Sequence, residues 1–465
     1  MYYVSTRDVS RRLTASQAIV DGLSRDGGLY LPEQIPQITT EEIKALAALS
    51  YPERAARLMK RYLDEFTEEE LLGFAKSAYG PAKFDTPAAA PVVKLTENTY
   101  IQELWHGPTC AFKDMALQML PYLLTAEGMK GDVVILTATS GDTGKAALEG
   151  FRDVDRTKIL VFYPDGGVSE MQKLQMVTQE GKNVGVCAVR GNFDDAQTGV
   201  KRIFSDEALR EELAGRGYFL SSANSINWGR LLPQIVYYVS AYCDLLNAGA
   251  IEAGDAVNFC VPTGNFGNIL SGFYAKKMGV PIGRLICASN ENNVLTDFIK
   301  TGTYDRNRPF YQTASPSMDI LISSNLERLL SLLSGSDEEV RGYYLRAKAF
   351  LFPGEEDFGI TPVEAQSAGT PVLAFGRGGA CETVLDGKTG LLFDEQTPES
   401  LEACIQKFET EGVAYPPQQI REHSRSFSEQ RFEDELRDYC TRRYADWQRE
   451  LEACSHHETA KEAEE

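Results

Sequence analysis

The chain is poor in histidine and has no long apolar run. Only four histidines occur among 465 residues, and His456 and His457 lie in a polar C-terminal tail, which argues against a histidine-rich metal site. No apolar run reaches the ~20 residues that a membrane span needs, and the first residues lack the apolar segment of a secretory signal. We therefore expect a cytoplasmic protein without a bound metal.

Basic residues are also scarce relative to acidic ones. The chain has 47 Lys and Arg against 67 Asp and Glu, which gives a formal net charge of -20. This balance argues against a broad surface for nucleic acid or anionic membrane, because such surfaces need clustered Lys and Arg. An anionic substrate would need a local basic pocket. The sequence says nothing about the oligomeric state.

The nine cysteines are scattered and form no C-x-x-C pair. Most of them lie within apolar runs, such as VGVCAV around Cys187 and VNFCVP around Cys260. We therefore expect reduced thiols buried in the core rather than disulfides or metal ligands.

The order of apolar patterns predicts an α/β chain with several domains. Helical patterns such as EEIKALAAL and EEELLGFAKSAY dominate the start, and short apolar runs such as DVVILTA, KILVFYP and AVNFCVP then alternate with helical stretches. This alternation indicates a mainly parallel sheet covered by helices. We expect an α-rich subdomain at 1–90, an α/β region at 91–340, a second α/β segment at 341–410, and helices with an acidic tail at 411–465.

Lys113 is the first candidate for catalysis. It ends the segment HGPTCAFK and directly precedes the helical pattern DMALQMLPYLL. A lysine at the mouth of a helix can form a Schiff base if its neighbours or burial lower its pKa. The alternative from the residues alone is a solvated lysine at a helix start.

Two glycine-rich loops follow strand-like runs and open helices. The first is TSGDTG at 139–144 and the second is PTGNFGN at 262–268. Backbone N–H groups and the helix dipole bind anions in this context, although such turns also use glycine for purely structural reasons. Neither loop has the spacing of a nucleotide P-loop or of a dinucleotide fingerprint.

A polar cluster, SANSINWGR at 222–230, is the third candidate. Its amides, hydroxyls and the guanidinium of Arg230 could clamp a phosphate. The alternative is a helix N-cap followed by a surface arginine.

These segments together resemble the threonine synthase family. The strings STRD, DGGLYLP, HGPTCAFKDMALQ, ATSGDTGKAAL, GNFDDAQ, SSANSINWGR, PTGNFGNILSGFYAKKMG and MDILISSNLERLL occur in the order and spacing of that family, over residues 1 to about 340. The resemblance implies a type II pyridoxal-phosphate fold, similar to the tryptophan synthase β subunit. It implies pyridoxal 5′-phosphate as cofactor, with Lys113 as its Schiff-base lysine and with the backbone donors of a cradle around the cofactor phosphate: Gly264, Asn265, Phe266, Gly267 and Asn268.

The same resemblance implies a lyase that converts O-phospho-L-homoserine and water to L-threonine and phosphate. Ser140, Gly141, Asp142 and Thr143 would lie near the substrate carboxylate, and Asn224 and Arg230 are candidates for its phosphate. Lys113, tethered beside the reacting carbons, would shuttle protons. The partner expected is therefore a small phosphorylated amino acid.

A different resemblance begins after residue 340. The stretch RAKAFLFPGEEDFGITPVEAQSAGTPVLAFGRGGACETVL is similar to the C-terminal part of retaining glycosyltransferases of the GT-B type. The resemblance gives Glu356 and Glu364, which are separated by seven residues, a role in holding a sugar nucleotide, whereas the residues alone also allow an ordinary strand-loop-helix unit with exposed acids. It spans only about 341–410, a Rossmann-like half-domain without an acceptor domain.

The chain therefore has the appearance of a fusion near residue 340. Threonine synthases continue for a further segment that usually carries the hydroxyl residue facing the pyridine nitrogen, and this segment is replaced here. Two alternatives to a working threonine synthase follow: an inactive chimera that retains a pyridoxal-phosphate pocket, and a nucleotide-sugar glycosyltransferase.

Overall fold

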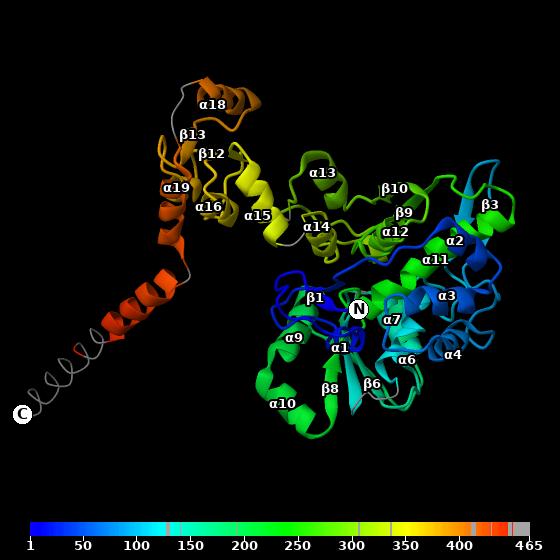
Figure 1. Cartoon of the computed structure of the whole chain (residues 1–465). Coiled ribbons are helices and arrows are strands. Elements are labelled where there is room, and N and C mark those ends of the chain that lie inside the picture. Colours follow the sequence, from blue (N-terminus) through cyan, green and yellow to red (C-terminus); the bar gives the residue numbers. More distant parts are fainter. Residues whose placement is uncertain are drawn as a thin grey trace, which may run out of the picture. The chain divides into compact units, whose positions relative to one another are not determined.

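The computed structural model describes residues 1–126, 131–139, 141–191, 193–305, 307–334, 337–410, 415–428, 430–444 and 449. The chain divides into two compact units, Met1–Leu332 and Leu333–Glu465. Figure 1 shows the elements of both units.

The first unit begins with four helices and a pair of short strands. Three of the helices start at a capping box, in which the N-cap hydroxyl and a Glu or Gln three residues later satisfy each other's backbone N–H groups. Antiparallel pairing joins the two strands. The elements are β1 (Tyr3–Ser5), α1 (Ala15–Asp21), β2 (Tyr30–Pro32), α2 (Thr40–Ala47), α3 (Tyr51–Lys60) and α4 (Glu68–Tyr79).

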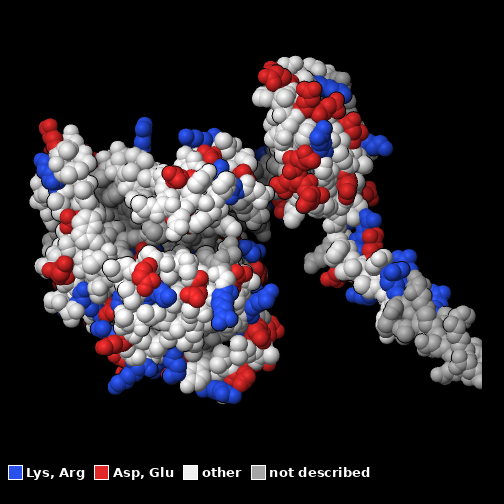
Figure 2. Space-filling view, turned by 180° about the vertical axis from the view of Figure 1, so that it is seen from behind, with Lys and Arg blue, Asp and Glu red and all other residues white. Residues whose placement is uncertain are grey.

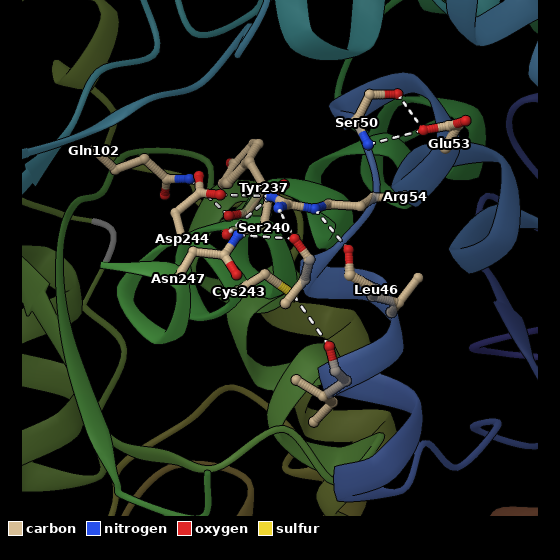
Figure 3. Close-up of polar contacts among 12 residues, drawn as sticks. Leu46, Ser50, Glu53, Arg54, Gln102, Tyr237, Ser240, Cys243, Asp244 and Asn247 are labelled. Carbon is tan, nitrogen blue, oxygen red and sulfur yellow. Dashed lines mark hydrogen bonds and ion pairs between the residues drawn. The ribbon is translucent and has the colours of Figure 1, made fainter. Parts of the chain in front are cut away.

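A buried arginine ties these helices to the long helix α11 (Trp228–Asn247). Figure 3 shows Arg54 of α3 reaching Ser240 and Asp244 on successive turns of α11. The guanidinium donates to Ser240 Oγ at 2.9 Å, to Asp244 Oδ1 at 2.6 Å, and to the carbonyls of Leu46 and Ala47 at the end of α2 at 3.0 Å each. One cation therefore fixes α2, α3 and α11 together.

A four-stranded parallel sheet, in the order β7-β6-β5-β8, forms the middle of the unit. The strands β5 and β6 coincide with the apolar runs DVVILTA and KILVFYP that the sequence predicted. Residues between the N-terminal helices and the end of this sheet form β3 (Val92–Lys94), β4 (Tyr100–Gln102), α5 (Asp114–Leu117), α6 (Leu120–Leu124), β5 (Asp132–Ala138), α7 (Asp142–Phe151), β6 (Thr157–Pro164), α8 (Glu170–Val177), β7 (Val184–Val189), α9 (Phe193–Ser205), α10 (Glu207–Gly215) and β8 (Tyr218–Ser221).

Helices cover both faces of this sheet. Ile135 and Ile159 face one core, which includes residues of α7 and α11. Leu136 and Ala138 face a second core that α9 lines with Ala196 and Val200. The alternation of β5 residues between two apolar cores explains why residues 133–136 are all apolar.

The glycine-rich loops lie at the carboxyl ends of strands. The loop at 139–144 joins β5 to α7, and the loop at 262–268 joins β9 to α12. A separate parallel pair, β9-β10, packs beside α12. The elements after β8 are α11, β9 (Val257–Pro262), α12 (Gly267–Lys277), β10 (Ile282–Ala288), α13 (Val294–Thr301), the 3-10 turn η1 (Pro316–Met318) and α14 (Leu326–Ser334).

The second unit contains a three-stranded parallel sheet in the order β11-β12-β13, with apolar cores on both faces. Figure 2 shows Asp and Glu side chains crowding the surface of this unit. Its elements are α15 (Asp337–Arg346), β11 (Phe350–Phe352), α16 (Ile360–Ser367), β12 (Val372–Phe375), α17 (Ala380–Thr383), β13 (Gly390–Phe393), α18 (Pro398–Thr410), α19 (Pro417–Ser424) and the turn η2 (Arg425–Phe427).

The prediction of buried cysteines is wrong for most of the described positions. Five of the eight described cysteines are exposed, among them Cys187 and Cys260, which were expected in the core. Cys187 lies on the edge strand β7, and Cys260 lies on the outward face of β9 opposite the 48% exposed Ile286. Apolar runs on an edge strand and on a two-stranded pair therefore have one open face. Cys454 lies outside the described residues.

Among the described helices, none is both long and apolar enough to cross a bilayer.

Candidate active site

Lys113 lies at the N-cap of α5, at the end of a tightly folded loop. The Asp114 carboxylate accepts from the backbone N–H and the hydroxyl of Thr109, each at 2.8 Å. A Cβ on Gly107 would lie 2.6 Å from the Asp114 side chain, so this approach requires glycine. These contacts set the direction in which Lys113 leaves the loop.

The Lys113 side chain is buried and not solvated. The residue is 8% exposed, and its Nζ donates to Oδ1 of Asp142, the first residue of α7. Burial lowers the pKa of Lys113, the Asp142 carboxylate opposes this shift, and the nearby Arg230 guanidinium adds to it. The alternative of a solvated helix-start lysine is therefore wrong. The Lys113 amine loses its proton at a lower pH than a surface lysine does.

Arg230 is also buried, on the first turn of α11, so the alternative of a surface arginine is wrong. Its Nη1 donates to the Ala223 carbonyl at 2.6 Å, whereas its buried Nε has no hydrogen-bond partner among the described residues. Burial lowers the pKa of Arg230 to about 10, and the Asp142 carboxylate opposes this shift. An unpartnered N–H on a buried guanidinium favours an anionic ligand.

The loop that ends β5 is organised by Thr139. Its hydroxyl accepts from the N–H groups of Gly141 at 3.0 Å and Gly144 at 2.9 Å. Gly141 has a φ of 156°. Asp142 and Thr143 open α7 and are partly exposed, which leaves them accessible to a ligand. Ser140, the other residue predicted for the substrate carboxylate, lies outside the described residues.

The loop before α11 supports the helix start. Asn227 caps α11 by accepting from the Gly229 N–H at 2.8 Å, and its amide donates to the carbonyls of Ile19 and Ser222. Asn224 is half-buried, and its backbone N–H donates to Ser222 Oγ at 3.2 Å. The predicted helix N-cap is therefore present beside the two candidate phosphate ligands.

The loop at 264–268 offers a row of free backbone donors. Within the described part of the chain, none of the five N–H groups from Gly264 to Asn268 donates a hydrogen bond. Phe266 has a φ of 66°, in the left-handed region that a residue with a Cβ rarely adopts. Five unpaired N–H groups at the start of an eleven-residue helix suit a phosphate dianion.

The side chain of Asn268 points away from such a cradle. Its Oδ1 accepts from the hydroxyls of Tyr237 at 2.5 Å and Tyr238 at 2.8 Å, both on α11. A Cβ on Gly267 would lie 3.6 Å from the Cβ of Ser225, just before α11. The loop therefore packs on the same helix that carries Arg230, whose charge acts on Lys113.

Sequence reasoning missed two residues that hold the carbonyl groups of the loop at 264–268. Ser323 Oγ donates to the Gly264 carbonyl at 2.5 Å, and Asn325 donates to the Asn265 carbonyl from both its backbone N–H and its side-chain amide, at 3.2 Å each. Both lie within the string MDILISSNLERLL, which contributed to the family resemblance without any residue being given a role.

The two glutamates predicted in the second unit are exposed. The carbonyl of Glu356 accepts from the Gly379 N–H at 2.7 Å, and Glu364 Oε2 accepts from the Tyr344 hydroxyl at 3.2 Å. These contacts agree with a strand-loop-helix unit carrying exposed acids, and they do not test the sugar-nucleotide role.

Three family models match the chain. Residues 2–79 match "Threonine synthase N terminus", residues 83–344 match "Pyridoxal-phosphate dependent enzyme", and residues 324–430 match "Glycosyl transferases group 1". A threonine synthase from Pseudomonas aeruginosa is 43% identical over 338 residues, which cover 72% of this chain and 69% of that protein. The chain belongs to the threonine synthase family.

Solved structures of the family agree. The pyridoxal-phosphate-bound threonine synthase from Brucella melitensis is 34% identical, with a TM-score of 0.66 over 91% of this chain and all of that one. The fold of this threonine synthase family member is therefore the type II pyridoxal-phosphate fold, and its cofactor is pyridoxal 5′-phosphate. The buried Lys113 amine and the free N–H groups at 264–268 fit that cofactor.

Some relatives of the chain are much longer than the part that matches it. "Threonine synthase-like 1" from Pongo abelii is 46% identical over 357 residues, or 73% of this chain. The chain spans about half of that relative, because the match covers 48% of its length. The glycosyltransferase match overlaps the pyridoxal-phosphate match over residues 324–344, so both family patterns include α14.

Proposed function

We propose that the chain converts O-phospho-L-homoserine and water to L-threonine and phosphate, with Lys113 as the lysine that bonds the cofactor. The observation that carries the proposal is the buried Lys113 amine, which contacts Asp142 and is influenced by Arg230. Family membership supports a small phosphorylated amino acid as the substrate, and the named reaction goes beyond that membership.

Bound pyridoxal phosphate supplies an electron sink for carbanions. The backbone N–H groups of residues 264–268 would hold its phosphate, and Lys113 would hold its aldehyde carbon. Because burial lowers the pKa of Lys113, its amine would give up a proton more readily than a surface lysine and could move protons at the reacting carbons. Asp142 keeps this nitrogen in one position while it is charged.

The substrate would be held by two groups of donors. The backbone at the start of α7, with Ser140, Gly141, Asp142 and Thr143, would bind the carboxylate, aided by the helix dipole. The free Nε of Arg230, with Asn224 beside it, would bind the phosphate that leaves. A buried guanidinium is suited to this role because it stabilises the negative charge that grows on the leaving oxygens.

The test is phosphate release from O-phospho-L-homoserine by the purified full chain loaded with pyridoxal phosphate. We expect release with wild type and none with Lys113→Ala. Lys44→Ala, at an exposed lysine on α2, is the matched control and should keep full activity. Equal rates with Lys113→Ala and wild type would refute the proposed role of Lys113.

A second candidate is a chain that binds the cofactor without turning over the substrate. It is favoured by the open outer face of β9-β10, where Cys260 and Ile286 are exposed, and by the family match that covers 69% of the Pseudomonas aeruginosa enzyme. A purified protein that binds pyridoxal phosphate through Lys113 but releases no phosphate would select this candidate.

Binding of a nucleotide diphosphate that depends on Glu364 remains a prediction for the second unit. The density of acidic side chains on that unit does not favour it, because a diphosphate needs nearby positive charge (Figure 2).

A further inference from the structure

The free donors of the loop at 264–268 depend on how its peptide groups are turned. In a trans peptide the carbonyl of one residue and the N–H of the next point to opposite sides, and the described chain has no cis bond. Ser323 and Asn325 hold the carbonyls of Gly264 and Asn265. The N–H groups of Asn265 and Phe266 must therefore point away from Ser323 and Asn325.

Arg328, on the first turn of α14, holds Asn325 in place. This fully buried guanidinium donates to Asn325 Oδ1 at 2.5 Å and to the Tyr30 carbonyl at 2.8 Å. It also donates to the carbonyls of Ser225 at 3.3 Å and Ile226 at 2.5 Å. One side chain thus joins β2, the loop before α11 and the residues that orient the cradle.

None of the four acceptors of Arg328 is a carboxylate. Burial lowers the pKa of Arg328 to about 10, while the nearby Glu327 carboxylate and Tyr274 oppose the shift. Burying a cation against carbonyl groups alone is costly, and an apolar side chain of similar size would fill the space more cheaply. What the rigid fork of donors supplies is geometry, because it holds four acceptors in fixed positions.

We propose that Asn325 and Arg328 are positioning residues for the cofactor phosphate: they fix the peptide groups at 264–266 with their N–H groups toward the phosphate, without touching it. This inference rests on the proposed use of the 264–268 loop. It assigns a role to α14, the helix that both family patterns include. It also explains why the left-handed backbone of Phe266 is tolerated, because the contacts on Asn265 hold the strained backbone in place.

The N-terminal segment secures α14 from outside. Arg7 donates two hydrogen bonds to the Glu327 carboxylate, at 2.9 and 3.0 Å, and the Thr6 hydroxyl donates a third at 2.5 Å. The Arg7–Glu327 pair is partly exposed and contributes less than a buried pair. Arg7 should therefore affect the cradle in the same direction as Arg328, but more weakly.

The experiment compares binding of pyridoxal phosphate and pyridoxal to the full-length apo-protein by absorbance titration. Pyridoxal keeps the aldehyde that reacts with Lys113 but lacks the phosphate. We expect Arg328→Lys to weaken pyridoxal phosphate binding about tenfold or more, because the single ammonium cannot serve four acceptors. Pyridoxal binding should change by no more than about twofold, since it loses no contact to the cradle.

A second variant keeps the test decisive if Arg328→Lys does not fold. Asn325→Asp retains size and the acceptor for Arg328 but replaces the amide that donates to Asn265, and we expect it to weaken pyridoxal phosphate binding by about tenfold. Arg7→Met should give a smaller loss of the same kind. Arg12→Met, which removes the similarly exposed pair with Glu33 and does not involve α14, should bind both ligands like wild type.

Two outcomes would overturn the inference. One is unchanged pyridoxal phosphate affinity in folded Asn325→Asp or Arg328→Lys. The other is an equal loss for pyridoxal phosphate and pyridoxal, which would mean general loosening of the fold. A wild-type chain that binds neither ligand would instead refute the proposed function itself, so the two failures can be told apart.

Discussion

The side-chain nitrogen of Lys113 donates to the carboxylate of Asp142, which lies 29 positions later at the start of α7. The contact joins the segment of the catalytic candidate to the loop that was expected to bind the substrate carboxylate. It also sets two effects against each other, because burial lowers the pKa of Lys113 while Asp142 raises it. The protonation state of the amine therefore depends on Asp142.

Replacement of Asp142 by asparagine should shift the pH dependence of cofactor binding. Asp142→Asn removes the group that raises the pKa of Lys113 and leaves burial and Arg230 unopposed. The neutral amine then persists to lower pH, so the pH of half-maximal association rate should fall. Stopped-flow absorbance of apo-protein with pyridoxal phosphate measures this. Glu170→Gln, at an exposed acid, should leave the profile unchanged, and an upward shift in Asp142→Asn would contradict the assignment.

His106 should make the stability of the Lys113 loop depend on pH. Its ring nitrogens contact Glu103 at 2.8 Å and Asp85 at 2.6 Å, and these carboxylates raise the pKa of His106, with Glu103 having the largest effect. A raised pKa in the folded state means that the stabilisation is complete below the unfolded pKa and is lost as pH rises through the folded pKa.

The measurement is the thermal midpoint of wild type and His106→Gln across a pH series. The advantage of wild type should be largest at acidic pH, while the carboxylates remain ionised, and should shrink as pH rises above the usual histidine range. Asp85→Asn with Glu103→Gln serves as the control, because removing both carboxylates should flatten the dependence. An advantage that grows with pH would contradict the prediction.

Much of the fold could be predicted because its helices and strands carry apolar residues at the spacing of each element. The strands β5 and β6 and the helices α2 and α4 coincide with the predicted runs. Cys187 and Cys260 were misjudged because a run of apolar residues does not reveal whether a strand lies at an edge. Whether a strand lies at an edge depends on which strands pair with it, and those strands are far away in the sequence.

The site was predictable where a residue belonged to a local motif, and not where tertiary contacts gave it its role. Lys113 was found from its turn and helix, although its burial was not. Arg328 lies in an ordinary amphipathic helical pattern, LERLL, in which an arginine is normally a solvated residue. Three of its four acceptors come from two distant segments of the chain, so only the fold shows its function.

Loss of the Arg54 clamp should destabilise the first unit strongly. Arg54→Met leaves the Asp244 carboxylate without its cation and removes one donor from each of the Leu46 and Ala47 carbonyls, which should cost about 3 kcal/mol. Arg57→Met, on the same helix, breaks only the exposed pair with Glu68 and should cost less than about 1 kcal/mol. Urea unfolding followed by the fluorescence of the buried Trp228 reports on this unit. Equal losses in the two variants would show that Arg54 adds nothing beyond a surface pair.

The glycine before the Lys113 loop should matter for the site more than for the fold. In Gly107→Ala the new methyl group would meet the Asp114 side chain at 2.6 Å, so the carboxylate must move and release Thr109. We expect cofactor binding to weaken by about tenfold or more, since Lys113 loses its fixed direction. The matched variant is Gly73→Ala on α4, where nothing lies within 4 Å of the added methyl. It should stabilise the unit by about 0.5–1 kcal/mol and leave cofactor binding unchanged. Similar cofactor affinities in the two variants would show that the turn at Gly107 does not govern the position of Lys113.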